Sequence, residues 1–225
     1  MALIKVPTVR TEFTLEDFTR ALVKSWFSLY NVYPGKSSIA VIYGQNSLET
    51  GCSKFCWNYN IGNAKVKDET GKDIEYCILN NVWEIINGVK VILKPENPGS
   101  WFRSFKTLDD GILFHLDFLK NKRYKSSFKY IEAGDPIGFC HDLKLLYYYS
   151  APEEQYRAGV VAYFNIFMKS PIFDKILQEL KIENDKKNEV IVEPVVEMPK
   201  IEITKVEPIK LTFWQSIMEI ILKIF

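Results

Sequence analysis

Residues Ser47–Asn63 read SLETGCSKFCWNYNIGN, and this stretch decides the fold. Apolar residues recur at near-helical spacing from Ile39 onward, which predicts a helix that starts near Ser37 and stops at Gly51. Glu49 falls in the last turn of this helix, directly before a loop of Trp, Tyr and Asn. The stretch therefore predicts a carboxylate at a helix end, beside aromatic and amide side chains.

Glu49 stands where a helix normally carries a cation. The negative end of the helix dipole opposes ionisation of a carboxyl group there, and an apolar wall beside it would oppose ionisation further. Both effects raise its pKa. Residues that break a local rule in this way are often functional, while the alternative is an ordinary surface Glu beside a helix C-cap.

The same stretch resembles the active-site segment of the glucosaminidase family, peptidoglycan hydrolases of the lysozyme-like superfamily. The shared pattern is Q-x-x-L-E-T-G-x-S-x-x-x-W-N-Y-N-x-G-N over Gln45–Asn63, and in that family the Glu is the general acid. The resemblance continues in order from about Phe13 to Met168 and includes the FRSF sequence at Phe102–Phe105. It implies a mainly helical α+β fold: a lysozyme-like domain over residues 1–181 with a small β-hairpin.

The loop after the helix fits sugar recognition. Aromatic faces such as those of Trp57 and Tyr59 stack on pyranose rings, and amides such as those of Asn60 and Asn63 hydrogen-bond acetamido and hydroxyl groups. We predict that these four residues bind substrate. Asn58 and Asn63 could instead be turn formers, because Asn favours tight loops for backbone reasons alone.

A second carboxylate is predicted on a β-hairpin. Tyr76–Ile86 and Val89–Leu93 read as strands joined by Asn87-Gly88, which is typical of a type I′ turn. This turn pairs Glu84 with Val91, so Glu84 lacks a cation across the strands and is expected among apolar neighbours. The resembling family carries its candidate second carboxylate on such a hairpin, which makes Glu84 a candidate catalytic residue. An edge-strand acid that opposes aggregation is the alternative.

Two separated carboxylates suit glycoside hydrolysis. One protonates the glycosidic oxygen while the other activates water or stabilises positive charge at the anomeric carbon. If Glu84 does not reach the site, one acid suffices for the reaction of the resembling lytic transglycosylases, in which the substrate's own hydroxyl forms an anhydro product. The alternative from another class is a virion or cell-wall binding protein that kept the fold but lost catalysis.

A Tyr-rich segment is expected to line the same cleft. The resembling family carries a Y-x-T-D-P-x-Y motif, and residues 147–152 read YYYSAP, with Ser and Ala in place of Thr and Asp. This matching puts Tyr148 on the first Tyr, or Tyr149 if the loop is shifted, and Tyr156 on the second after a two-residue insertion. The resemblance implies that Tyr148 holds the carboxylate or the sugar and that Tyr149 and Tyr156 bind substrate. Half-buried packing is the alternative.

The four cysteines and two histidines give little indication of a metal site or of a nucleophilic cysteine. The cysteines are Cys52, Cys56, Cys77 and Cys140. They lack a paired C-x-x-C signature, so a zinc site that includes His141 is disfavoured against free buried thiols or one disulfide. A Cys nucleophile would have only two candidate bases, and His115 reads as a packed or surface imidazole. We expect no metal and no cofactor.

Two capping sequences predict further helices. TLED at Thr14–Asp17 opens a helix to about Ser28, which is expected to pack on the helix before Glu49. TLDD at Thr107–Asp110 opens a helix to about Leu119.

Composition indicates one catalytic-sized domain with an appendage. The 225 residues are 47% hydrophobic and carry a formal net charge of +1, which gives no basic footprint for nucleic acid. The N-terminal MALIKVP lacks the apolar core and cleavage pattern of a secretory signal. A phage enzyme fits this condition, located in the host cytoplasm and then at the cell wall as an endolysin, or carried in the virion.

The chain changes character after residue 181. Residues 182–210 alternate Val, Ile, Glu, Lys and Pro and are expected to form an extended linker. Residues 211–225, LTFWQSIMEIILKIF, are too short to span a bilayer and are expected to form an amphipathic docking helix. Its partner could be another protein, a second copy or a membrane surface, and the single Lys favours a protein. A final helix packed on the core is the alternative.

Overall fold

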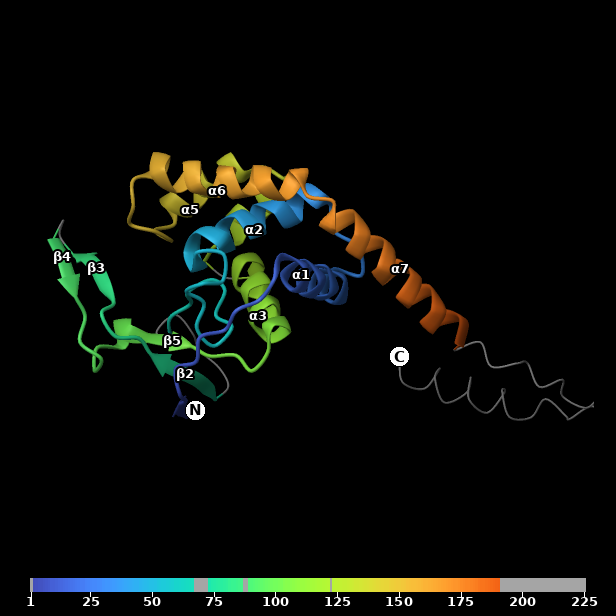
Figure 1. Ribbon diagram of the computed structural model, residues 1–225. Helices are drawn as coiled ribbons and strands as arrows, with labels where there is room; N and C mark the ends of the chain where they lie inside the picture. The colour runs from blue at the N-terminus through green and yellow to red at the C-terminus, as the bar shows by residue number, and fades with distance from the viewer. Residues whose placement is uncertain (1, 67–72, 87–88, 122, 191–225) are drawn as a thin grey trace, which may run out of the picture. The chain divides into compact units, whose positions relative to one another are not determined.

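The computed structural model describes residues 2–66, 73–86, 89–121 and 123–190. Within them the chain forms seven α-helices and two small sheets (Figure 1). This confirms the mainly helical α+β class. The chain divides into two compact units, Met1–Asp185 and Lys186–Phe225, and the candidate site described below lies in the first. None of the described helices is long and apolar enough to cross a membrane.

Helix α1 (Leu15–Tyr30) begins with the predicted capping box. The Asp17 amide donates to Thr14 Oγ1 at 3.0 Å, and the Thr14 amide donates to Asp17 Oδ2 at 3.0 Å. The helix touches α2, as expected, but its larger contact is with α3 (Leu108–Asn121). Helix α3 in turn starts at the predicted cap, where the Asp110 amide donates to the Thr107 hydroxyl oxygen at 3.1 Å.

Helix α2 (Lys36–Thr50) is the central helix of the first unit. It ends at Gly51 in the left-handed region (φ 57°), as its sequence predicts. Its apolar residues are buried around the whole helix, which places it in the core. It packs chiefly on α6 (Glu153–Lys169), and a Cβ at Gly44 would lie 2.6 Å from the Val160 carbonyl oxygen. This close approach brings the start of α6 to the end of α2.

The remaining helices are α4 (Lys125–Ala133), α5 (Pro136–Leu145) and α7 (Ile172–Val190). Helix α7 includes residues 182–190, so the prediction of an extended linker from residue 182 is wrong. These residues include the helix formers Glu183, Lys186, Lys187 and Glu189, and the sequence has no Gly or Pro between residue 182 and Pro194 to end the helix earlier. The rest of the predicted linker and the docking helix lie outside the described residues.

The two sheets are small. In the first, β2 (Ile74–Ile78) pairs in parallel with β1 (Leu3–Lys5) and antiparallel with β5 (Trp101–Arg103). In the second, β3 (Trp83–Ile86) pairs antiparallel with β4 (Val89–Ile92). Figure 1 shows this β3–β4 hairpin set apart from the helices, beyond β2 and β5.

The hairpin has the predicted register, with Glu84 opposite Val91. Its turn residues 87–88 lie outside the described residues. The expectation of one continuous strand over Tyr76–Ile86 is wrong, because β2 and β3 are separate strands in different sheets. Asn81 lies between them at φ 59°, a left-handed conformation that Asn tolerates and that turns the chain.

Candidate active site

A cleft of about 940 Å³ is lined by residues from the end of α2, the start of α6, the Tyr-rich segment before α6 and the hairpin. Of the predicted site residues, those that line it are Glu49, Trp57, Asn63, Glu84, Tyr148, Tyr149 and Tyr156. Tyr59 and Asn60 do not. The structure thus brings together side chains from positions that lie far apart in the sequence.

Two side chains hold the carboxylate of Glu49. The Tyr156 hydroxyl donates to Glu49 Oε1 at 2.9 Å, and Asn63 Nδ2 donates to Oε2 at 3.3 Å. Asn63 Nδ2 also donates to the Glu49 carbonyl oxygen at 3.1 Å. Asn63 therefore bonds to both the backbone and the side chain of Glu49 and positions the carboxyl group, whereas the sequence had suggested that it binds substrate.

The pKa of Glu49 is raised. Burial is the largest cause, and the hydrogen bonds from Tyr156 and Asn63 oppose it in part. The position at the carboxyl end of α2 acts in the same direction as burial. Glu49 as a whole is half-buried and lines the cleft, so a ligand can reach it. A carboxyl group that keeps its proton to higher pH yet faces a cleft is equipped to act as a general acid.

The Tyr148 hydroxyl bonds to the loop between α2 and β2 and not to Glu49. Its hydroxyl donates to the Gly62 carbonyl oxygen at 3.0 Å. The hydrogen bond to the carboxylate that the resemblance suggested for Tyr148 is made by Tyr156, because α6 packs on α2 and its first turn reaches the end of that helix. Burial raises the pKa of both phenols well above the usual value, so both remain neutral donors.

Tyr149 supports Tyr156. The two rings are stacked with centroids 3.7 Å apart and an angle of 7° between their planes. The Tyr149 hydroxyl donates to the Cys140 carbonyl oxygen at 2.9 Å, which ties the stack to α5. The Tyr156 side chain, whose hydroxyl donates to Glu49, is thereby held both by its own helix and by the stacked Tyr149 ring.

Glu84 reaches the cleft from the hairpin, together with Lys65. The Lys65 ammonium pairs with Glu84 Oε1, so the expectation of an acid among apolar neighbours is wrong. Lys65 comes from the loop before β2 and not from the paired strand, so reasoning across the hairpin could not find it. The second carboxylate therefore enters the cleft with a cation at its side.

Comparison with models of protein families, with curated proteins and with solved structures gives no match. The chemistry of the cleft is therefore inferred from its own residues.

Trp57 lines the cleft, whereas the Asn60 side chain hydrogen-bonds to the backbone and stabilises the loop between α2 and β2. Asn60 is buried, and its Nδ2 donates to the carbonyl oxygens of Ala64 and Arg103 at 2.9 and 3.0 Å. Its Oδ1 accepts from the Ala64 amide at 2.9 Å, so the prediction that Asn60 binds sugar is wrong. Tyr59 has φ 51°, a left-handed conformation, and its side chain does not line the cleft.

Asn58 is the turn former that its residue type allowed. It has φ 48°, and its Oδ1 accepts from the Val9 amide at 2.8 Å. Its Nδ2 donates to the Pro7 carbonyl oxygen at 2.9 Å. The loop between α2 and β2 is thus shaped by asparagine side chains that bond to backbone.

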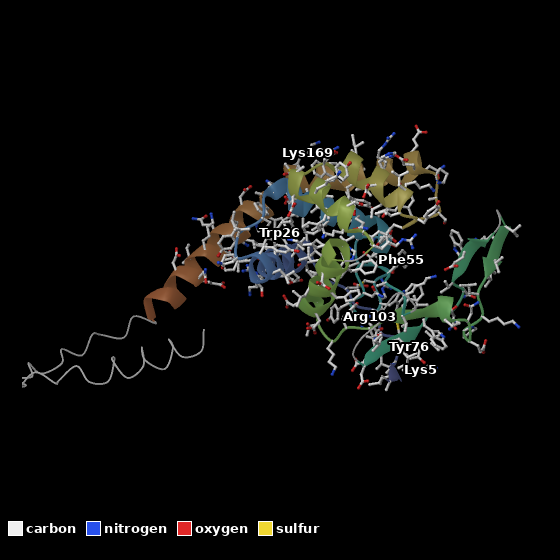
Figure 2. All side chains as sticks on the ribbon, turned by 180° about the vertical axis from the view of Figure 1, so that it is seen from behind. Lys5, Trp26, Phe55, Tyr76, Arg103 and Lys169 are labelled. Carbon is white, nitrogen blue, oxygen red and sulfur yellow. The ribbon has the colours of Figure 1, made fainter. Side chains whose placement is uncertain are left out.

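The lining of the cleft also includes residues that were not predicted, among them Phe55, Lys65 and Arg123. Phe55 exposes 63% of its surface, and Figure 2 shows it on the side of the helices that faces the hairpin. Its place between Glu49 and Trp57 was the available signal. Lys65 and Arg123 offered none beyond their charge, because each comes from a segment without a motif.

The cysteines are free. Cys52 is exposed, whereas Cys56, Cys77 and Cys140 are buried. Burial raises the pKa of the three buried thiols, which leaves them protonated and poor nucleophiles. Within the described ranges, no group of three or more His, Cys, Asp and Glu side chains is placed to hold a metal ion.

His115 is a packed imidazole, as expected. It is buried beside the acid's helix, with Nε2 3.1 Å from Gln45 Oε1. Burial lowers its pKa to about 4, so it is neutral at pH 7. Its ring leaves no room for a Cβ at Gly62, and the loop that Tyr148 holds therefore packs directly on the imidazole.

Proposed function

We propose that this protein cleaves the glycan strand of peptidoglycan, with Glu49 as the general acid of a lysozyme-like domain over residues 1–181. The observation that carries the proposal is the placement of Glu49: it ends α2, lines an open cleft and is gripped by Tyr156 and Asn63. The resemblance of Gln45–Asn63 to the glucosaminidase segment supports the same substrate.

The proton on Glu49 would pass to the oxygen of the glycosidic bond, and the bond would break as positive charge grows at the anomeric carbon. Tyr156 and Asn63 donate to the carboxylate that remains, so they stabilise the acid after it has given up its proton. The same two residues then hold the carboxylate in place for the next proton. Trp57 and Phe55 offer aromatic faces to the sugar rings.

Glu84 would complete the hydrolysis, by activating water or by stabilising the positive charge. Lys65 beside it fixes the direction of the carboxylate. The same ion pair favours a second candidate reaction, because a carboxylate engaged by a lysine is a weaker base. In that reaction Glu49 acts alone and the substrate's own hydroxyl closes an anhydro ring.

The test is the cutting of purified cell walls by the wild-type protein and by Glu49→Gln, followed by mass analysis of the new ends. Reducing N-acetylglucosamine, reducing N-acetylmuramic acid and anhydro ends distinguish glucosaminidase, muramidase and transglycosylase. A wild-type protein that binds walls without cutting them would instead be a binding protein on the same fold. Delivery as a phage endolysin or virion component, with residues 211–225 docked on a partner, remains part of the proposal.

A further inference from the structure

A cluster of cations lies where helix α3 is followed by α4. The sequence from Lys120 to Lys129 reads KNKRYKSSFK and has five Lys or Arg residues, with no acidic residue between Asp117 and Glu132. The basic patch consists of those that the structure describes: Lys120, Arg123, Lys125 and Lys129. The whole chain carries a formal net charge of only +1, so this segment is a local concentration of positive charge.

The cations of the basic patch lack carboxylate partners. In the part of the chain that the structure describes, none of the four forms an ion pair, whereas lysines elsewhere do, such as Lys36 with Asp174. The Lys120 ammonium lies 3.6 Å from the centroid of the Tyr30 ring, and the other three side chains belong to exposed residues. Three exposed positive charges are therefore available to an anion from outside the chain.

These charges do not stabilise the helix that bears them. Helix α4 begins at Lys125 and has no acidic residue in its first turn. A cation there faces the positive end of the helix dipole, and Lys125 and Lys129 are four residues apart, a spacing at which like charges on a helix repel each other. Residues that oppose the local structure in this way are often functional, and a bound anion would relieve the repulsion.

The basic patch begins at the rim of the cleft. Arg123 lines the cleft, and its guanidinium lies 5.9 Å from the centroid of the Tyr147 ring, which also lines it. Lys125 and Lys129 follow on α4, outside the cleft lining. A strand held in the cleft and an anionic polymer attached to that strand could therefore be bound at the same time.

The basic patch offers charge without aromatic faces. Tyr124 and Phe128 are the aromatic residues between Lys120 and Lys129, and both are buried. Proteins that bind single-stranded nucleic acid stack the bases on aromatic rings, and buried rings cannot serve in this way. Phosphate groups, by contrast, need only the Lys and Arg charges. The patch therefore favours a polyanion without bases.

We infer that the basic patch binds the phosphates of an anionic phosphodiester polymer attached to the glycan of the cell wall. The choice of a wall polymer rests on the proposed function, because a patch at the rim of the cleft meets whatever the bound glycan carries. Contacts with several phosphates release counterions, so the affinity should fall steeply as the salt concentration rises. The polymer would hold the enzyme at the wall while the cleft engages the glycan.

The first test measures binding of soluble poly(glycerol phosphate) to the full chain by calorimetry. Binding to the wild type should weaken steeply between about 50 and 200 mM salt. At the lower concentration, the double variant Lys125→Gln/Lys129→Gln should bind about thirtyfold more weakly, the loss expected for two lysines beside an anionic surface. Lys5→Gln/Lys169→Gln changes the net charge equally at two exposed sites, labelled in Figure 2, and should bind like the wild type.

The second test compares the same proteins on intact cell walls and on walls from which hydrofluoric acid has removed the phosphodiester polymer. Lys125→Gln/Lys129→Gln should clear intact walls several-fold more slowly than the wild type. It should clear the stripped walls at the wild-type rate, because neither lysine lines the cleft. The control double variant should behave like the wild type on both preparations.

Equal affinity of the two double variants for the polymer would overturn the inference, as would an equal slowing of Lys125→Gln/Lys129→Gln on intact and stripped walls. A variant that loses affinity for DNA alone and cuts both preparations normally would assign the patch to nucleic acid, and the inference would fail. If the polymer binds with the expected dependence on charge but no wall is cut, the proposed function fails alone and the anion site stands.

Discussion

The Tyr156 hydroxyl lies 2.9 Å from Glu49 Oε1 and donates a hydrogen bond to it. This bond favours the ionised carboxylate and so lowers the pKa of Glu49, against the larger effect of burial. The phenol on α6 thereby makes it easier for the carboxyl group on α2 to release its proton. The two helices are each other's chief packing partners, and their contact fixes this geometry.

Replacing Tyr156 by Phe should move the pH dependence of cutting. Glu49 must be protonated to act, so the rate falls as pH rises through its pKa. Without the hydroxyl, the carboxylate loses a donor and the pKa rises further, so this alkaline limb should move to higher pH. The maximal rate should fall on the order of tenfold to a hundredfold, because the acid is also less well positioned. Tyr130→Phe on α4 is the control, and a limb that stays in place or moves to lower pH would contradict the role of Tyr156.

Removing the Tyr148 hydroxyl should reduce cutting without touching the acid directly. Tyr148→Phe loses the bond to the Gly62 carbonyl oxygen and loosens the loop that carries Asn63. We expect a several-fold lower rate and a loss of about 1 kcal/mol in the free energy of unfolding. Tyr33→Phe is the matched control, because it also loses a bond to a backbone carbonyl, that of Leu180, away from the cleft. Equal activity of the two variants would rule out a role for the loop contact beyond stability.

The products of Glu84→Gln should distinguish the two candidate reactions. If Glu84 assists hydrolysis, the variant should cut on the order of a hundredfold more slowly and still release reducing ends. Glu96→Gln, at an exposed site just after the hairpin, is the control and should cut like the wild type. An unchanged rate with anhydro ends would show that Glu49 acts without a second carboxylate.

His115 should make the fold sensitive to acid. Its pKa is lowered to about 4 in the folded protein by burial, from 6.5 in the unfolded chain, so the folded state resists protonation. The contribution of the neutral imidazole is complete above pH 6.5 and is lost as pH falls toward 4, by about 3 kcal/mol.

This loss can be measured by denaturant unfolding of the wild type and of His115→Gln between pH 7 and pH 4. Glu49 acts in the opposite sense, because its raised pKa means that stability is lost as pH rises. Its effect is common to both proteins and cancels in their difference. A difference that does not change with pH would contradict the account of His115.

Local features of the structure were predictable where a single short segment of the sequence determines them. The apolar spacing before Glu49 and the helix stop at Gly51 placed the acid in the last turn of α2. The Asn87-Gly88 dipeptide gave the hairpin register, with Glu84 opposite Val91. In each case the turn chemistry and the side-chain period act over a few neighbouring residues.

Contacts between distant segments were not predictable in the same way. Lys65 reaches Glu84 only because the loop before β2 lies against the hairpin. Tyr156, rather than Tyr148, reaches Glu49 because of how α6 packs on α2. Asn60 has the residue type of a sugar ligand, but its backbone places its amide inside the loop. Residue type suggested the chemistry, whereas tertiary packing decided which side chains take part.

The most direct measurement compares the rate at which purified bacterial cell walls lose turbidity with the wild type, Glu49→Gln and Glu132→Gln. Glu132 is exposed on α4 and supplies the same chemical change away from the cleft. The account predicts that the wild type and Glu132→Gln clear the walls at the same rate and that Glu49→Gln is slower by about a hundredfold or more. Equal clearing by all three proteins, or clearing by none, would contradict the assignment of Glu49 as the general acid of a peptidoglycan-cleaving enzyme.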